Sequence, residues 1–298
     1  MAKKTIITAA LTGAVTPAGF DIPATPEKIA EEAYQAWKLG ASVVHLHMRD
    51  DEGLGTMDAE KFKQTIKLIR EYKDCDVIIN CTSSGDGRVS GGDPEGNAIR
   101  MKHHKTLDGI EMGSFDAGSF NWMPAGVFMN TPEFLQDLGD VYIERGIKPE
   151  IEIFDAGMLG VTNYYVKKGH LSTPCHFQFC LGVLGAMPAT VENLLYLLDK
   201  IPEGSTWSAF GVGKGHMPIM YAAIALGGHI RVGMEDNVVY SVNEDGTKVK
   251  ATNAMLIERA VGAVKAFGNE VATPAEAREM LGIKAFDGAA VRKTLGIA

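Results

Sequence analysis

The feature that most constrains the fold is a repeated alternation between short apolar runs and longer stretches with helical periodicity. Eight apolar runs of strand length recur along the 298 residues. Their approximate bounds are 5–11, 43–50, 77–82, 109–115, 149–154, 176–181, 206–212 and 229–235. Strands that alternate with helices indicate βα units and a parallel sheet. Because eight such units close naturally in about this length, the sequence predicts an α/β protein with a (β/α)8 TIM-barrel fold.

Threonine-proline pairs mark where several of the intervening helices should begin. Thr25-Pro26, Thr131-Pro132 and Thr273-Pro274 each place an N-cap residue before a proline at the first helical position. We expect helices over 26–39, 58–72, 132–145, 161–168, 188–199, 216–226, 252–267 and 273–281. The segment 91–105 is less regular, and the pattern over 109–115 is the weakest of the eight apolar runs.

An open, doubly wound sheet or two separate domains would also suit a chain of this length. However, no Gly-X-Gly-X-X-Gly sequence follows the first apolar run, and no linker-like change in composition divides the chain. We therefore expect one barrel domain over residues 1–298, ending in C-terminal helices.

Composition and charge restrict the function. The net charge is −8 and no arginine-rich tract is present, which argues against a nucleic-acid partner and favours a small-molecule substrate. No charged-then-apolar leader opens the chain, and no apolar run reaches the length of about 18 residues that a membrane span needs. We therefore expect a cytoplasmic protein with no membrane partner.

The chain has four cysteines, which lack the Cys-X-X-Cys spacing of structural zinc sites. They are Cys75, Cys81, Cys175 and Cys180. In a reducing cytosol we expect free thiols, and a cysteine nucleophile is the functional alternative.

Two histidines, His45 and His47, stand one residue apart in the second apolar run. In a strand they share one face with Arg49, because strand side chains alternate with period 2. Two imidazoles facing the same space suit a divalent metal, particularly zinc, which takes a carboxylate as third ligand in catalytic sites. Glu235, at the end of the last apolar run, is the candidate for that ligand. The alternative is a structural pair of core histidines.

In (β/α)8 barrels the catalytic groups lie at the C-terminal ends of the strands. The polar residues expected at or near those ends are His45, His47, Thr82, Ser114, Glu152, Arg231, Glu235 and Asp236. The last strand closes on the first, so Glu235 should lie two strands from the histidines, roughly 10 Å away at about 4.8 Å per step. Each residue could instead be a cap, a turn residue or half of a structural ion pair. Together they predict a charged site inside the barrel.

Five segments resemble the motifs of the β-keto acid cleavage enzymes. They are 12–14, 44–49, 149–152, 179–183 and 228–237, and the resemblance continues to 272–274. It implies a zinc-dependent (β/α)8 barrel, usually a homotetramer, with one zinc ion per subunit. Such an enzyme condenses a β-keto acid with acetyl-CoA and cleaves the product, in a reverse Claisen step, to acetoacetate and a new acyl-CoA. The known member of the family acts on 3-keto-5-aminohexanoate in lysine fermentation.

The resemblance also implies a role for individual residues. The implied metal ligands are His45, His47 and Glu235. The implied substrate-binding groups are the hydroxyls of Thr82 and Ser114 and the backbone of Ser84 and Gly85. The implied catalytic base and its electrostatic support are Asp236, Arg231 and Glu152. The family has serine at the position of Thr82 and threonine at that of Ser114, so both hydroxyls are retained.

One departure from the family concerns the part of the site that holds the substrate tail. Val15 stands where the 3-keto-5-aminohexanoate enzyme has a glutamate that binds the substrate ammonium. Valine cannot accept a hydrogen bond from an ammonium group, and burying that cation without compensation is costly. We therefore expect a neutral, rather apolar β-keto acid. The amino acid remains the alternative, because another acid such as Asp116 could reach the same space.

The sequence gives weaker indications of a CoA-binding segment and of two other protein classes. The glycine-rich segment 211–216 after the seventh strand is the candidate contact for CoA phosphates, although it could be only a tight turn. Metal-dependent amidohydrolases also use His-X-His in a barrel, but on the first strand and with further histidines. A non-catalytic binding or scaffold protein could keep the same barrel.

Overall fold

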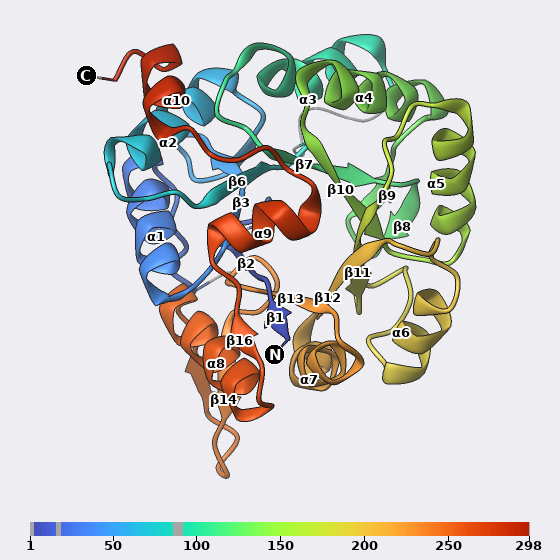
Figure 1. Cartoon of the computed structure of the whole chain (residues 1–298). Coiled ribbons are helices and arrows are strands. Elements are labelled where there is room, and N and C mark those ends of the chain that lie inside the picture. Colours follow the sequence, from blue (N-terminus) through green and yellow to red (C-terminus); the bar gives the residue numbers. More distant parts are fainter. Residues whose placement is uncertain (1–2, 16–18, 86–91, 298) are drawn as a thin grey trace.

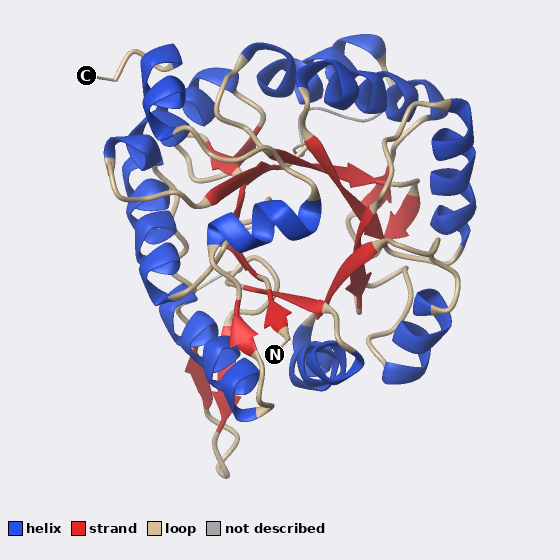
Figure 2. Cartoon of the chain, viewed as in Figure 1, coloured by secondary structure: helices blue, strands red, loops and turns tan. Residues whose placement is uncertain are grey.

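The computed structural model describes residues 3–15, 19–85 and 92–297. Within these residues, eight parallel strands form a closed barrel surrounded by helices (Figures 1 and 2). In chain order the barrel strands are β2 (Ile7–Ala10), β3 (Val43–Leu46), β6 (Ile78–Cys81), β7 (Met112–Asp116), β10 (Lys148–Ile153), β11 (His176–Leu181), β12 (Thr206–Gly211) and β13 (His229–Val232). Each strand pairs in parallel with the next, and β13 closes the ring on β2. The predicted (β/α)8 fold is confirmed.

The helices outside the barrel follow the strands in alternation. Those of the outer ring are α1 (Pro26–Leu39), α2 (Ala59–Glu71), α3 (Pro94–Thr106), α4 (Pro132–Arg145), α5 (Gly157–Lys168), α6 (Val191–Leu198), α7 (His216–Leu226) and α8 (Asn253–Ala266). The expected caps form, since the hydroxyls of Thr25 and Thr131 accept hydrogen bonds from the N–H groups of Lys28 and Phe134. Each such cap contributes about 1 kcal/mol.

Several elements differ from the sequence-based expectation. The first apolar run is divided into β1 (Lys4–Thr5) and β2, and the second is interrupted at His47 before β4 (Met48–Arg49) pairs with β5 (Gly55–Thr56). The other elements without a predicted counterpart are α3, η1 (Gly213–Gly215), α10 (Gly288–Thr294), β16 (Glu270–Val271), the hairpin of β8 (Phe120–Trp122) with β9 (Gly126–Phe128), and the hairpin of β14 (Val239–Val242) with β15 (Lys248–Lys250). Helix α3 has no apolar periodicity because its buried residues include Arg100, His103 and His104.

The barrel has an apolar outside and a polar inside. Apolar side chains such as Val44, Ile79 and Phe177 belong to the large core cluster between strands and helices. Inside the barrel, Asn80 donates to the carboxylate of Glu150 at 2.7 Å, and other polar side chains follow on neighbouring strands. A polar interior is costly unless its groups are paired or used. The interior is therefore where functional groups are expected.

One end of the barrel is closed by α9 (Pro274–Leu281), which lies across the barrel axis in Figure 1. The small apolar cluster beneath it joins α9 to the starts of four strands, and we call it the barrel floor. Its members are Ile6, Val43, Ile78, Met112, Ala272, Ala277 and Leu281. The preceding strand, β16 (Glu270–Val271), pairs with β1. Because the floor is sealed, access to the interior is from the carboxyl ends of the strands.

Among the described residues, no helix has the length and apolar character required to span a lipid bilayer.

Candidate active site

A cavity of about 330 Å³ lies at the carboxyl ends of the barrel strands. Its polar lining residues are His45, His47, Thr82, Ser84, Asp116, Glu152, Arg231, Glu235 and Asp236. Its apolar lining comes mainly from Phe120, Trp122, Met123, Phe128, Phe154, Val183, Leu184, Phe210 and Val212. Of these, only Val212 belongs to a segment that the sequence indicates as a candidate contact, the one for CoA. The cavity is thus polar on one side and apolar and aromatic on the other.

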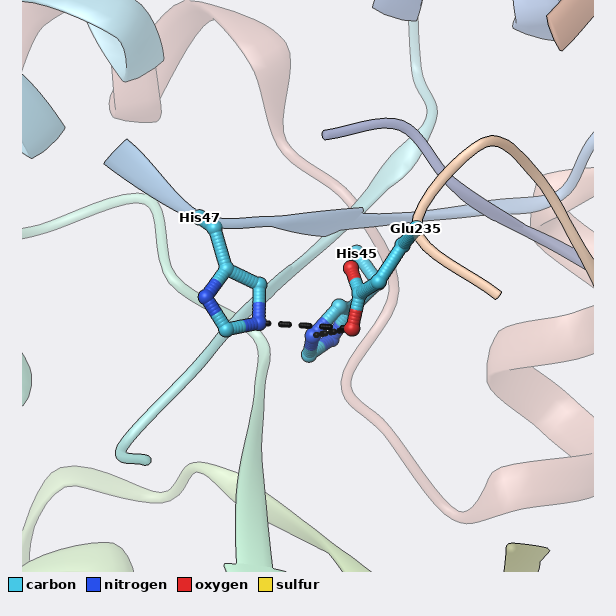
Figure 3. Close-up of side chains that lie close together, drawn as sticks. All are labelled: His45, His47 and Glu235. Carbon is cyan, nitrogen blue, oxygen red and sulfur yellow. Dashed lines mark ion pairs between the residues drawn. The ribbon is translucent and has the colours of Figure 1, made fainter. Parts of the chain in front are cut away.

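His45, His47 and Glu235 converge in this cavity, as Figure 3 shows. His45 belongs to β3, His47 follows it directly, and Glu235 lies in the turn after β13. The Oε1 atom of Glu235 is 3.5 Å from Nε2 of His45 and 3.3 Å from Nε2 of His47. All three ligand atoms lie within 4.8 Å of one another. These side chains lie close together because β13 and β3 are separated only by β2 in the closed barrel, as the sequence predicted.

The pKa shifts of His45 and Glu235 favour binding of a cation between them. Burial lowers the pKa of His45 well below its usual value, which keeps the imidazole neutral, the form that binds metals. For Glu235 burial acts to raise the pKa, but Arg231 and the two histidines outweigh it, so the pKa falls well below the usual value. The Oε2 atom of Glu235 is buried without a hydrogen-bond partner among the described residues. Two imidazoles and a carboxylate with an oxygen that has no hydrogen-bond partner among the described residues fit the donor set of a catalytic zinc site.

Arg231 is the cationic centre beside the trio. Its Nη2 donates to Oε1 of Glu235 at 2.6 Å and to Oδ1 of Asp236 at 2.9 Å, while its Nε donates to Oδ2 of Asp236 at 3.0 Å. Its Nη1 lies 3.6 Å from Oε1 of Glu152 and 4.0 Å from Oε2 of Glu150. Burial acts to lower the pKa of Arg231, but these carboxylates raise it well above its usual value. The guanidinium is therefore permanently charged at the cavity wall.

Asp236 differs from Glu235 in its proton affinity. Burial raises the pKa of Asp236 to about 6, although Arg231 opposes the increase. Such a carboxylate is ionised at neutral pH but accepts a proton readily, which is the property required of a general base. Asp236 lines the cavity next to Glu235, so a bound substrate could present a proton to it.

Three further carboxyl groups enter the barrel from two neighbouring strands. Asp116 on β7 lies opposite Glu152 on β10, and Glu150 precedes Glu152 on the same face. Burial, followed by repulsion from Glu152, raises the pKa of Glu150 to about 8 and that of Asp116 well above its usual value. These two groups therefore hold protons at neutral pH. The Oε2 atom of Glu150 also lies 3.8 Å from Nδ1 of His45, behind the metal-ligand candidates.

The hydroxyl-bearing residues predicted to bind substrate are only partly brought to the cavity. Thr82 donates to the hydroxyl of Ser84 at 2.9 Å and accepts the N–H of Ser84 at 3.0 Å, and both residues line the cavity. Ser114 and Gly85 are buried behind this surface and do not belong to the lining. The hydroxyl of Ser114 has no hydrogen-bond partner among the described residues.

Val15 lines the mouth of the cavity and is 58% exposed. Arg49, expected on the histidine face, does not line the cavity. Its Nη2 instead donates to the carbonyl oxygens of Thr12 and Val15, and its Nη1 donates to that of Gly53. The expectation of one continuous face was wrong because the chain leaves the barrel strand after Leu46. Arg49 thus anchors the loop that carries Val15.

The aromatic side of the cavity comes from the β8–β9 hairpin, and we call Phe120, Trp122 and Phe128 the aromatic wall. The ring of Phe120 lies 5.3 Å from that of Phe128 and 4.7 Å from that of Phe154, and Trp122 lies 6.1 Å from Phe128. A turn signal, 123–126, between two short apolar runs could have identified the hairpin. No local pattern indicates that the hairpin folds over the barrel mouth.

The glycine-rich segment after β12 forms the 3-10 turn η1, next to Val212 at the cavity wall. A Cβ atom on Gly215 would lie 2.1 Å from Cβ of Ala189, so a side chain there would collide with the neighbouring loop. Lys214 is exposed in this turn. The turn is thus tightly packed on one side and presents a cation to solvent on the other.

The cysteines lie outside the cavity lining, and all four are buried free thiols. Burial raises the pKa of Cys75 to about 11 and that of Cys180 well above its usual value. Because the thiolate is the nucleophilic form, the free-thiol prediction is confirmed and nothing favours a cysteine nucleophile.

Comparison with known proteins gives a consistent result. A family model described as beta-keto acid cleavage enzyme matches residues 4–283. A 3-keto-5-aminohexanoate cleavage enzyme from Fusobacterium nucleatum is 42% identical over 95% of this chain and 100% of its own length. A 3-dehydrocarnitine:acetyl-CoA trimethylamine transferase from Rhizobium meliloti is 32% identical over 94% of this chain and 97% of its own. A 3-oxoadipate:acetyl-CoA acetyltransferase from Cupriavidus necator is 31% identical over 96% of this chain and 98% of its own.

Among solved structures, the apo structure of ObcA superposes with a TM-score of 0.76 at 20% identity. The match covers 88% of this chain and 65% of that one. At this identity the similarity concerns the fold, which is again the barrel described above.

Proposed function

The chain belongs to the β-keto acid cleavage enzyme family, and we propose that it condenses a β-keto acid with acetyl-CoA and releases acetoacetate and a new acyl-CoA. The observation that carries the proposal is the convergence of His45, His47 and Glu235 beside Arg231 and Asp236 in one cavity. Relatives named for transfers with acetyl-CoA support the co-substrate. An amidohydrolase would need further histidines as metal ligands. A scaffold protein would not need metal-ligand candidates beside a buried arginine and a buried aspartate.

We assign His45, His47 and Glu235 as ligands of one zinc ion per subunit. When bound, zinc would act as a Lewis acid that polarises the substrate ketone. The three ligands come from the carboxyl ends of β3 and β13, which flank β2 in the barrel, and Glu235 is held in place by Arg231. The chain thus positions its donors before any ion binds, which lowers the cost of ordering them.

Asp236 would remove a proton from C2 of the β-keto acid, between the carboxylate and the ketone. The carbanion equivalent formed there attacks the thioester carbonyl of acetyl-CoA and displaces CoA. The CoA thiolate then adds to the original ketone at C3, and the bond between C2 and C3 breaks, which leaves the new acyl-CoA and a carbanion equivalent at C2. Asp236 returns the proton to C2, and C1, C2 and the acetyl unit leave together as acetoacetate. Arg231 would face the negative charge that develops on oxygen in these steps, and Glu152 would hold its other side.

The carboxylate of the β-keto acid would bind at the hydroxyls of Thr82 and Ser84. Ser114 and Gly85 would support that loop from behind, since neither lines the cavity. Lys214 and the turn η1 are the proposed contact for the CoA phosphates, because a cation at the edge of the cavity suits an anionic cofactor chain.

The tail of the β-keto acid would be neutral and apolar. Val15 at the mouth and the aromatic wall offer carbon surface to it, and burying apolar area is favourable at about 25 cal/mol per Å². 3-Keto-5-aminohexanoate is the second candidate, because the relative at 42% identity is named for that substrate. For that substrate Asp116 would have to receive the ammonium.

The proposal is tested by measuring acetoacetate formation from acetyl-CoA with the purified, metal-analysed enzyme. We expect 3-oxohexanoate to be preferred over 3-keto-5-aminohexanoate, and Val15→Glu to reverse the preference. Preference of the wild-type enzyme for the amino acid would refute the apolar tail while keeping the reaction. If no β-keto acid supports acetoacetate formation in the zinc-loaded protein, the reaction itself is wrong.

We further propose a homotetramer in the cytoplasm, on the resemblance to the family. The four free thiols are typical of a reducing compartment. Light scattering coupled to size-exclusion chromatography would give the subunit number, and a mass other than four chains would reject the tetramer.

A further inference from the structure

Helix α3 presents an unusual polar face to the barrel, made of Arg100, His103 and His104. These side chains bind three consecutive main-chain carbonyl oxygens, at the last residue of β6 and the two residues that follow it. Nε2 of His104 lies 3.2 Å from the oxygen of Cys81, Nε2 of His103 lies 2.8 Å from that of Thr82, and Nε of Arg100 lies 2.8 Å from that of Ser83. Because a carbonyl oxygen can only accept, each ring must carry its proton on Nε2.

These bonds fix the backbone that carries the cavity hydroxyls. In a trans peptide the N–H points away from the C=O, so holding the oxygens toward α3 directs the N–H groups to the other side. The N–H of Thr82 donates to the carbonyl of Leu46, and that of Ser84 donates to the hydroxyl of Thr82. The loop is therefore held from both sides, and the hydroxyls of Thr82 and Ser84 have a defined position.

Arg100 also reaches the other wall of the cavity. Its Nη1 donates to the carbonyl of Met129 at 3.2 Å, and its Nη2 donates to Oδ1 of Asn130 at 2.5 Å. Asn130 in turn donates to the carbonyls of Asp116 and Gly118, where the chain leaves β7 for the hairpin. One guanidinium therefore connects the hydroxyl-bearing loop with the base of the aromatic wall.

This contact is made by a buried cation that forms no salt bridge with the described residues. Arg100 is 1% exposed, the hydrogen bonds that it donates to described residues go to neutral oxygens, it stacks on the ring of Phe134 at 3.9 Å, and Asp116 interacts with its charge electrostatically. Burial lowers its pKa to about 10, so it stays charged at neutral pH. Burying such a charge is costly, and a neutral side chain could donate hydrogen bonds to the same oxygens without that cost. The charge also adds a positive contribution to the electrostatic potential near the cavity, which favours an anionic substrate.

We propose that Arg100 is a positioning residue that sets the distance between the Thr82–Ser84 hydroxyls and the aromatic wall, and thereby the affinity and preferred chain length of the β-keto acid. This inference rests on the proposed function. A substrate whose carboxylate binds at one wall and whose tail binds at the other is sensitive to that spacing. The metal ligands and Arg231 belong to the segments at the ends of β3 and β13, whereas the hydrogen bonds of Arg100 go to Ser83, Met129 and Asn130.

The test compares Arg100→Met and Arg100→Lys with matched variants of Arg70. Arg70 is an equally buried arginine on α2, which donates to the carbonyl of Cys75 and to the carboxylate of Glu111 and stacks on Phe286, at the floor end of the barrel. We expect Arg100→Met to raise KM for the β-keto acid about tenfold or more and to flatten the preference among chain lengths. Arg100→Lys should recover part of the affinity. KM for acetyl-CoA and the zinc content should stay unchanged.

Arg70→Met should lower Tm without changing KM for the β-keto acid by more than about twofold. If Arg100→Met raises KM no more than Arg70→Met, the residue is only structural and the inference fails.

A second measurement separates this inference from the proposed reaction. Backbone hydrogen exchange over 78–85 should be faster in Arg100→Met than in the wild-type protein and unchanged in Arg70→Met, whatever the enzyme turns over. Unchanged exchange in Arg100→Met would overturn the positioning role. Absence of turnover with normal exchange differences would instead count against the proposed function alone.

Discussion

The two ends of the barrel contain buried ion clusters of opposite composition. At the floor, one carboxylate is shared by two arginines, since Glu111 accepts from Arg70 at 3.0 Å and from Nε of Arg278 at 2.6 Å. Asp76 lies 3.9 Å from Arg278 at the edge of this cluster. At the cavity, a single guanidinium, that of Arg231, is shared by carboxylates of four residues. The floor cluster contains as many arginines as carboxyl groups, whereas the cavity cluster contains more carboxyl groups than arginines.

The difference shows how similar residues serve different purposes. Both arginines of the floor stack on one ring, Phe286, and tie α2 and α9 together, which is a structural task. The cavity cluster lacks positive charge, and buried carboxylates must find a cation or a proton. Protons on Glu150 and Asp116 supply part of that need, and a divalent ion at Glu235 would supply the rest. A shortage of cations for the buried carboxyl groups thus distinguishes the cavity end of the barrel from the floor.

The largest effect should come from removing a ligand at the cavity. We expect His45→Ala to lose the bound zinc and to lower kcat/KM at least about 10³-fold, since a Lewis acid contributes several kcal/mol to such reactions. Metal analysis and acetoacetate assays measure both effects. A variant without zinc that remains active would refute the metal centre. Circular dichroism should show an intact barrel, because His45 is not part of the floor.

The matching change at the floor should affect stability but not catalysis. Glu111→Gln leaves two buried guanidiniums without their shared carboxylate, which should cost about 3 kcal/mol of unfolding free energy. Urea unfolding measures the loss. Below the unfolding transition, kcat/KM should equal that of the wild-type enzyme. A tenfold fall in kcat/KM of the folded variant would show that the two ends are coupled and would break the comparison.

The effect that is smallest at neutral pH concerns stability in acid, to which His229 at the start of β13 contributes. Burial, with a smaller contribution from Lys3, lowers the pKa of His229 to about 4 from 6.5. Between these values the unfolded chain binds a proton that the folded chain does not, so stability falls as the pH decreases from 6.5 to about 4. The slope per such histidine is at most about 1.4 kcal/mol per pH unit, and above pH 6.5 this group has no effect.

The variant His229→Asn keeps an acceptor for the N–H of Ile6, which now bonds to Nδ1 at 3.2 Å. Its stability should therefore vary less with pH across this window in urea titrations. An identical pH dependence in both proteins would show that His229 is not responsible.

Local sequence signals were sufficient for the barrel because strand-like apolar runs recur eight times, threonine-proline caps recur at three helix starts, and most of these signals are independent of distant contacts. The threonine-proline caps and β-branched runs predicted the helix starts and the strand order, and strand order brought Glu235 to the histidines. Helix α3 was not predicted because several of its buried side chains are polar, so it lacks the hydrophobic periodicity of an amphipathic helix. The aromatic wall was not predicted because its contact with the cavity depends on how the β8–β9 hairpin folds over the barrel. No residue spacing along the chain indicates that arrangement.

The pairing of β1 with β16 has a consequence for biosynthesis. Lys4 lies beside Glu270 and Thr5 beside Val271, so the first strand to leave the ribosome must wait for a partner made some 265 residues later. At about 5–20 residues per second, this wait lasts tens of seconds at the slower rates. During that time Ile6 and Val43 lack the cover that α9 provides. The nascent barrel is therefore open at its base, and this surface is where a chaperone would be expected to bind.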